Sequence, residues 1–376
     1  MGPECKILVW WSSALASMPA HLTDYDFAAT ADEIYADEAR RQGRSHEEIM
    51  QQVAEAWNGS DKLSGVVIKS PGAPDMYDYE RVARAVPPLP GIGYIFVQIQ
   101  KLDKFVDGCI ATTSSCVESV ALPYCRQFYK ERGQELFAVG LQAHPLCWSG
   151  PAVISNERVK SFLDGAVRHY GAKSVLYISF GSLFFPVATP QHVEALIDTL
   201  LELEQPFPFL LALGGRMASL PQELIDRVNA TGKGLICDFW VEQRAILQHA
   251  ALGWFLTHGG FNSMTEALIQ GIPLIIWPTS AEQPVNAALL SADPHPVAIE
   301  LLQVRTGPQL MGPTLRGGLN ITGAVQDAAE EFRVTFTDAR GARGAVLREN
   351  AAKISLALRE ARVGEASEEL IRLAQF

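Results

Sequence analysis

The feature that most constrains the fold is an alternation of apolar runs and amphipathic segments between Ser174 and Leu302. The runs SVLYISF, FPFLLAL, LGWFLT and IPLIIW have the length and composition of buried strands. Residues Pro190 to Glu204, which lie between the first two runs, repeat apolar side chains at helical spacing. This order predicts a parallel sheet with helices on both faces and right-handed crossovers. We therefore expect an α/β fold made of doubly wound, Rossmann-like units.

Glycine and polar turns follow these strands at one predicted edge of the sheet. In doubly wound sheets, ligands bind in the crevice beyond the carboxyl ends of the strands. The turns that fall there are Gly181–Ser182, Gly214–Gly215, Trp240, His258–Ser263 and Glu282–Gln283. We therefore expect these loops to share one binding crevice.

One of these turns has the composition of an anion site. His258, Gly259, Gly260, Asn262 and Ser263 stand between the end of a predicted strand and the start of a predicted helix. Unpaired backbone N–H groups and the helix dipole favour negative charge at such a place. Glycine lets the backbone approach a ligand closely, and the polar side chains add hydrogen-bond donors. A diphosphate is the ligand that this composition suits.

The block from Trp240 to Gln283 resembles the donor-sugar signature of the UDP-dependent glycosyltransferases of family 1. The positions that carry the resemblance are Trp240, Gln243, His249, Gly253, Thr257, His258, Gly260, Asn262, Ser263, Glu266, Gly271, Pro273, Pro278, Glu282 and Gln283. The resemblance implies a fold of GT-B type, in which two Rossmann-like domains face a cleft. Residues 1–145 would form an incomplete acceptor domain. Residues 146–376 would bind the UDP-sugar, with terminal helices that cross back to the first domain.

The resemblance also implies a task for each site residue. Trp240 would stack on uracil, a contact worth about 1–3 kcal/mol for a base on an aromatic face, and Gln243 would bind the uracil edge. The turn from His258 to Ser263 would hold the diphosphate. Glu282 and Gln283 would bind the sugar hydroxyls, and a glutamine at the last position is associated with glucose.

Two further site residues have an ordinary structural alternative. Ser182, in the sequence FGS, would contact a phosphate, or it is a turn serine. Glu266 would accept both ribose hydroxyls, or it forms a capping box with the helix start three residues earlier, at Ser263. Two positions depart from the family. Phe261 stands where plant members usually carry tryptophan, and Glu242 replaces the usual proline.

The N-terminal portion departs further from the family. KILVWWSSALAS resembles a middle strand of the acceptor domain and the helix after it, so we expect the catalytic histidine and its orienting aspartate to be absent. His21 superficially imitates the base, although a loop histidine is the plainer interpretation. Two functions remain open. One is an inverting transfer of a hexose, with glucose favoured, from a UDP-sugar to a small hydrophobic or phenolic acceptor. The other is a catalytically inactive UDP-sugar-binding remnant or partner protein.

Composition excludes several other classes of protein. A net charge of −11 argues against nucleic acid as a partner, because phosphate contacts need clustered cations. The chain contains no nucleotide-binding G-x-G-x-x-G between a strand and a helix and no Walker A sequence. Asp24-Tyr25-Asp26 could imitate a metal-binding motif, but a solvated acidic segment from Asp24 to Glu38 is the plainer interpretation. We expect neither a metal nor a cofactor, the UDP-sugar being a substrate.

Two expectations concern location and the loop near the C-terminus. No apolar run reaches transmembrane length, and the N-terminal residues do not form a secretory signal, so we expect a cytoplasmic protein. Residues Gly307 to Gly318 have the composition of a flexible surface loop. Arg305 and Arg316 beside it would be solvated, or would contact a phosphate.

Overall fold

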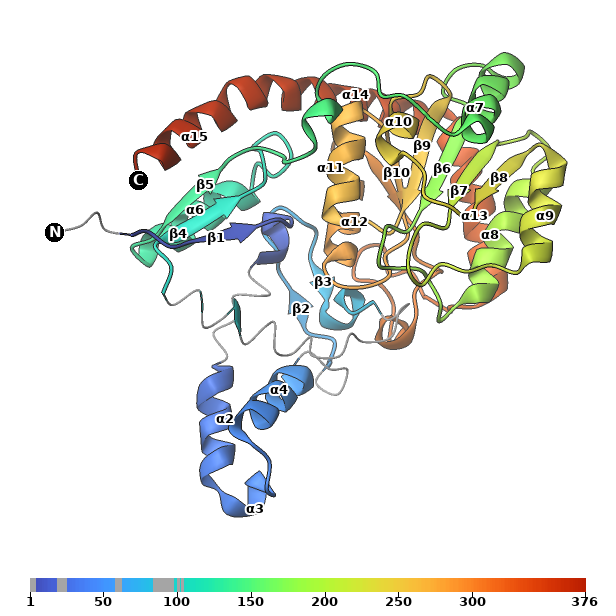
Figure 1. Cartoon of the computed structure of the whole chain (residues 1–376). Coiled ribbons are helices and arrows are strands. Elements are labelled where there is room, and N and C mark those ends of the chain that lie inside the picture. The colour runs from blue at the N-terminus through green and yellow to red at the C-terminus, as the bar shows by residue number, and fades with distance from the viewer. Residues whose placement is uncertain (1–4, 19–25, 58–62, 84–97, 100–101, 103–104) are drawn as a thin grey trace.

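The computed structural model describes residues 5–18, 26–57, 63–83, 98–99, 102 and 105–376 (Figure 1). His21, Asp24 and Tyr25 lie outside these residues. The hypotheses of an early base and of a metal-binding motif therefore stay predictions.

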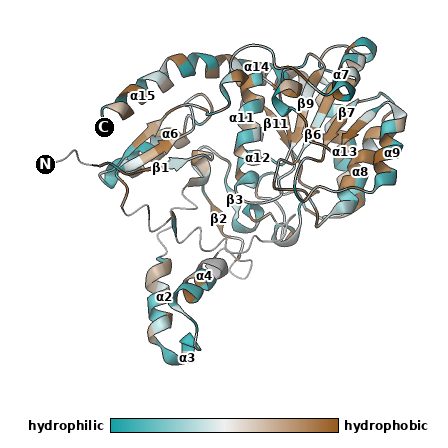
Figure 2. Ribbon diagram, viewed as in Figure 1, coloured by the Kyte–Doolittle hydropathy of each residue, from teal (hydrophilic) through white to brown (hydrophobic). Residues whose placement is uncertain are grey.

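The C-terminal part is built on a six-stranded parallel sheet. Its spatial order is β11-β10-β9-β6-β7-β8. The strands are β6 (Val175–Ser179), β7 (Phe209–Ala212), β8 (Gly234–Cys237), β9 (Leu252–Thr257), β10 (Leu274–Ile276) and β11 (Ala298–Glu300). Every residue of these strands is buried, and Figure 2 shows the strands as hydrophobic. The alternation in the sequence therefore predicted this sheet correctly.

Helices cover both faces of the sheet, because successive strand side chains point to opposite sides. Leu176 and Ile178 of β6 belong to one core, whereas Val175 and Tyr177 belong to the other. The first core includes residues of α8 (Pro190–Glu202), α9 (Gln222–Thr231) and α13 (Val325–Arg340). The second includes residues of α7 (Glu157–Tyr170), α10 (Gln243–Leu247), α11 (Phe261–Gln270), α12 (Gln283–Ser291) and α14 (Ala342–Val363). The expected doubly wound arrangement is confirmed.

A smaller parallel sheet forms the N-terminal part, in the order β1-β4-β5. Its strands are β1 (Leu8–Trp11), β4 (Gly108–Ala111) and β5 (Glu135–Ala138). Its core includes residues of α6 (Ala121–Glu131) and of the short 3₁₀ helix η1 (Leu15–Ser17). Four runs of this region, KILVWW, GVVIKS, GCIATT and LFAVG, have the apolar composition expected of strands. Three of them lie in this one parallel sheet.

The fourth run, GVVIKS, does not join that sheet. Its strand β2 (Val67–Ile68) pairs antiparallel with β3 (Met76–Tyr77). A tight turn explains the difference: Ala73 N donates to Ser70 O at 3.0 Å, with Gly72 at φ 80°. Proline followed by a glycine of positive φ at the two central positions is typical of a type II turn, which reverses the chain.

The described part of the predicted acidic segment, residues 26–38, is mostly helical, and its acidic side chains at Asp32, Glu33, Asp37 and Glu38 are exposed to solvent. Asp26 accepts from Ala29 N and caps α2 (Phe27–Ala36), which continues through α3 (Glu38–Arg41) to α4 (His46–Trp57). Phe27, Ala31, Ile49 and Met50 form a small core between α2 and α4. Figure 1 shows that this helical hairpin projects away from both sheets.

The last helix, α15 (Glu365–Ala374), lies against β5 of the smaller sheet (Figure 1). Glu369 Oε2 accepts from Ala138 N at 3.2 Å, and Arg372 Nη2 donates to Leu136 O at 2.6 Å. The C-terminal end of the chain therefore contacts its N-terminal part. The predicted domain boundary near residue 145 stays a prediction.

The region around Arg305 differs from both expectations for it. The Arg305 side chain is 3% exposed, and its guanidinium pairs with Glu80 at 3.3 Å and with Glu300 at 2.7 Å. Arg316 also pairs with Glu300. Residues of the predicted flexible loop form the 3₁₀ helix η5 (Gly307–Leu310), which packs against η3 (Asp78–Arg81). Arg305 is therefore a buried structural cation, because two acidic partners compensate its charge.

The helices of the described part of the chain include none that is both long and apolar enough to cross a bilayer.

Candidate functional site

The loops beyond the carboxyl ends of β6, β7, β8 and β9 contact one another. Arg216 N donates to Ser182 O at 3.1 Å, which joins the loops after β7 and β6. A Cβ at Gly181 would lie 2.7 Å from His258 Cε1, and one at Gly214 would lie 3.3 Å from Trp240 Cε3. The fifth predicted loop is adjacent as well, because a Cβ at Gly259 would lie 3.8 Å from Gln283 Cβ. The structure thus brings all five predicted loops together.

The turn between β9 and α11 has the backbone geometry expected of the predicted anion site. Gly260 is the N-cap of α11, so the first backbone N–H groups of this helix have no partner within it. Gly259 has φ +81°, and a Cβ there would lie 2.6 Å from Ile276 Cγ2, so only glycine fits. Asn262 is exposed and Ser263 half-buried in the first helical turn. Backbone and side-chain donors therefore surround the helix N-terminus.

His258 is a neutral member of this turn. Its side chain is buried beneath the loop after β6, with Nδ1 at 3.3 Å from Thr257 Oγ1. Burial lowers the pKa of His258 from 6.5 to about 4. At neutral pH the imidazole is uncharged and offers one N–H donor. Any attraction for a diphosphate here therefore comes from the helix dipole and from neutral donors.

Glu266 and Gln243 form a hydrogen-bonded pair beside the turn. Gln243 Nε2 donates to Glu266 Oε2 at 2.8 Å, and Tyr177 OH donates to Gln243 Oε1 at 3.3 Å. Helix α11 begins at Phe261, so Glu266 lies in its second turn and does not reach back to its start. The capping-box interpretation is therefore wrong. Sequence reasoning missed Tyr177, whose hydroxyl group lies on a buried and mostly apolar strand.

Trp240 is the most exposed aromatic residue of the site. It follows β8 and is 73% exposed, whereas large aromatic residues are usually well buried. One edge of its indole lies over Gly214, where any side chain would crowd it. Its exposed surface can therefore receive a planar ring.

Glu282 and Gln283 stand at the start of α12, after β10. Gln283 is 1% exposed, and its Oε1 accepts from Thr279 N at 2.8 Å, Thr279 Oγ1 at 2.9 Å and Ser280 N at 2.9 Å. These three donors fix the orientation of the amide, which leaves Nε2 to donate elsewhere. Burial raises the pKa of Glu282. Thr279, which sequence reasoning did not single out, thus orients Gln283.

No group of three or more histidine, cysteine, aspartate or glutamate side chains is placed to hold a metal within the described ranges. The expectation that no metal takes part stays a prediction.

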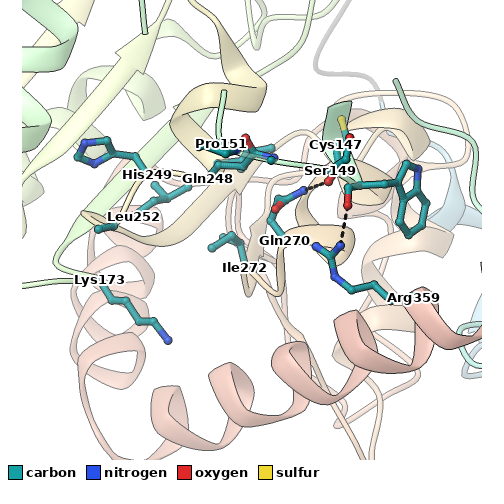
Figure 3. A pocket seen from close by; sticks show the side chains of 14 residues that line it. Cys147, Ser149, Pro151, Lys173, Gln248, His249, Leu252, Gln270, Ile272 and Arg359 are labelled. Carbon is teal, nitrogen blue, oxygen red and sulfur yellow. Dashed lines mark hydrogen bonds between the residues drawn. The ribbon is translucent and has the colours of Figure 1, made fainter. Parts of the chain in front are cut away.

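A hollow of about 370 Å³ lies at the opposite edge of the sheet (Figure 3). Its lining includes Lys173, Leu252 and Ile272, which stand at the amino ends of β6, β9 and β10. Its polar side chains hold the segment after η4 (Pro145–Cys147): Gln270 donates to Cys147 O, and Arg359 donates to Trp148 O at 3.0 Å. The side chains that line this hollow therefore hold the connecting segment in place. The hollow is separate from the predicted crevice.

The chain is similar to known proteins of one family. Residues 154–307 match the family model described as UDP-glucoronosyl and UDP-glucosyl transferase. The chain is 33% identical over 289 residues to UDP-glycosyltransferase eriJ of Hericium erinaceus, covering 74% of this chain and 55% of that protein. It is 38% identical over 119 residues to nuatigenin 3-beta-glucosyltransferase of Solanum aculeatissimum, covering 31% of this chain and 23% of that protein. The chain therefore spans about half, or less, of the length of these relatives.

Solved structures share the fold. A UGT transferase from Siraitia grosvenorii in complex with UDP aligns with a TM-score of 0.63 at 18% identity, covering 98% of this chain and 76% of that one. A UDP-glucosyltransferase from Polygonum tinctorium aligns with a TM-score of 0.60 at 22% identity, covering 93% and 68%. These likenesses confirm the expected GT-B type of fold. With the family match and the likeness to eriJ, they show that the chain belongs to the UDP-glycosyltransferase family.

Proposed function

We propose that this chain binds a UDP-sugar at the carboxyl edge of its six-stranded sheet. The observation that carries the proposal is the order of groups along that edge. Trp240 follows β8, and Glu282 and Gln283 follow β10. The turn from His258 to Ser263, which we call the phosphate turn, follows β9. Glu266, bonded to Gln243, stands beside the phosphate turn. The proposed donor has its parts in the same order. Its base would lie on the aromatic face, its ribose at the carboxylate, its diphosphate at the turn and its sugar at the last pair.

The proposed reaction transfers the hexose, with inversion, to a hydroxyl group of a small acceptor. As the bond from the sugar to the diphosphate breaks, negative charge grows on the departing UDP. The N-terminus of α11 and the neutral His258 would stabilise that charge. These groups act on the leaving group and need no metal to do so.

The proposed acceptor is hydrophobic or phenolic, and glucose is the proposed sugar. Support comes from solved structures of the same fold, which are described with 3,4-dichloroaniline, with pterostilbene, or as an anthocyanidin 3-O-glucosyltransferase. The donor-sugar proposal rests on Gln283, whose amide is held with only its Nε2 left to donate.

The general base is not assigned to a described residue. Such a base contributes about 10²–10⁴ in rate, and it must reach the acceptor hydroxyl. His258 lies in the phosphate turn and has a pKa of about 4. His46 pairs with Asp32 at 2.6 Å, but that pair lies on the hairpin that projects away from both sheets (Figure 1). His21 stays a prediction.

The test is transfer from UDP-glucose to a panel of small phenols, with products identified by mass and by anomeric configuration. The proposal predicts glycosides in which the configuration of the donor is inverted. UDP binding without any transfer would instead support the alternative, an inactive UDP-sugar-binding remnant or partner protein. Failure to bind UDP would contradict both.

A further inference from the structure

Asn286, on the second turn of α12, connects two parts of the proposed donor site. Its side chain is fully buried, and its Nδ2 donates to Gly259 O at 2.9 Å. Gly259 lies at the centre of the phosphate turn. The backbone N–H of Asn286 also donates to Glu282 O at 3.1 Å, one turn earlier on the same helix. Asn286 is therefore bonded both to the phosphate turn and to the proposed sugar-binding end of α12.

Packing alone does not explain an amide at this position. Asn286 Oδ1 is buried without a hydrogen-bond partner among the described residues. A buried carbonyl oxygen without a partner is unfavourable, so an apolar side chain would suit the space better. What the amide provides is its N–H donation to Gly259 O.

The surroundings make this connection rigid. Val285 and Ala288 on α12 belong to the core of the smaller sheet, together with Leu15 of η1. Gln283 packs beside Gly259, since a Cβ at Gly259 would lie 3.8 Å from Gln283 Cβ. Helix α12 is thus fixed on one side by the smaller sheet and on the other by the phosphate turn.

We propose that Asn286 is a positioning residue, which holds the phosphate turn and the sugar-binding residues of α12 in one geometry. The proposal rests on the proposed function, because the ligand it serves is the UDP-sugar. Asn286 does not itself touch the ligand. It orients the peptide of Gly259, and with it the backbone donors that face the diphosphate.

The experiment compares the affinities of UDP and uridine for the full chain by calorimetry. Asn286→Ala should weaken UDP binding by about threefold to tenfold, the effect of one hydrogen bond. The affinity of uridine, which lacks the diphosphate, should differ by no more than about twofold between the wild type and Asn286→Ala. Asn286→Asp keeps the shape but replaces the donor by a carboxylate, so it should weaken UDP binding at least as much as Asn286→Ala.

Asn350→Ala is the matched control. Asn350 is also buried, and its Nδ2 donates to a backbone carbonyl, Pro296 O, at 3.0 Å. Its loss should lower the unfolding temperature without changing the ratio of UDP to uridine affinity. The proposal is overturned if Asn286→Ala or Asn286→Asp binds UDP as the wild type does, or if Asn286→Ala weakens uridine and UDP equally. If the wild type itself fails to bind UDP, the proposed function is what fails.

Discussion

At the scale of single residues, the two glutamine side chains of the site are oriented by hydrogen bonds to neighbouring protein groups. Gln243 receives a hydrogen bond from Tyr177 and gives one to Glu266. Gln283 accepts three, two of them from Thr279. In both glutamines the amide is fixed before any ligand arrives. Preorganisation of this kind lowers the ordering cost of binding.

The residue types of the site could be predicted from the sequence, but their partners could not. Spacing within the 44-residue block, from Trp240 to Gln283, indicated which side chains gather at one edge. Tyr177 lies 66 residues before Gln243, so no local pattern connects them. The capping-box interpretation was wrong because of the position of the helix start. The spacing from Ser263 to Glu266 was present, but the helix begins two residues before Ser263.

His258 makes a pH-dependent contribution to stability. Its pKa is about 4 in the folded protein against 6.5 for the ordinary side chain, so the unfolded chain binds more protons between these values. The free energy of unfolding should therefore fall as pH decreases from 6.5 to 4, by roughly 3 kcal/mol at most. Urea unfolding of the wild type and of His258→Gln isolates this term. If the difference in the free energy of unfolding between the two proteins stayed constant from pH 7 to pH 4, the pH dependence would not come from His258.

At the scale of elements, the strands with continuous apolar runs were predictable because burial on both faces imposes that composition. GVVIKS also contains a continuous apolar run, but its strand β2 does not belong to the parallel sheet. The turn at Ser70 to Ala73 reverses the chain, so its strand pairs with the segment that follows. The hairpin from α2 to α4 was not predicted, because acidic side chains are frequent in its sequence and its core contains only a few apolar side chains.

The phosphate turn depends on close contact between β9 and β10, which a change at Gly259 tests. Gly259→Ala adds a Cβ at a positive φ and 2.6 Å from Ile276 Cγ2. We expect a loss of stability of about 1–2 kcal/mol from backbone strain and about 1–3 kcal/mol more from overpacking. UDP binding should weaken as well, because the turn must shift.

Gly43→Ala is the control for this prediction. Gly43 has φ +74° and nothing within 4 Å of a Cβ, so only the strain applies. Equal losses of stability in the two variants, measured by urea unfolding, would show that the contact with Ile276 does not constrain the turn.

At the scale of the whole molecule, long-range contacts join the N-terminal part of the chain to its C-terminal part, and two of them are informative. Helix α15 lies against β5, and Glu80 of η3 meets Arg305 beyond β11. The second contact could not be predicted, because Glu80 and Arg305 are 225 residues apart and each looks like an ordinary surface charge in the sequence. Only the fold removes both from water.

Removing Arg305 would leave Glu80 buried without its cation and would leave Glu300 with Arg316 alone. Arg305→Ala should therefore lower the free energy of unfolding by about 3–5 kcal/mol. Arg333, whose pairs with Glu202 and Glu330 are exposed, is the control, and Arg333→Ala should cost at most about 1 kcal/mol. Denaturant titrations that gave the same small loss for both variants would contradict a buried network.

The donor site is tested most directly by calorimetric titration of UDP into the full chain and into Glu266→Ala. We expect the wild type to bind one UDP and Glu266→Ala to bind it about 10- to 100-fold more weakly, since hydrogen bonds to a charged acceptor are lost. Glu223→Ala, a change at an exposed carboxylate on α9, should bind UDP as the wild type does. Undiminished UDP binding by Glu266→Ala, or no binding by the wild type, would contradict a UDP-sugar site at this edge of the sheet.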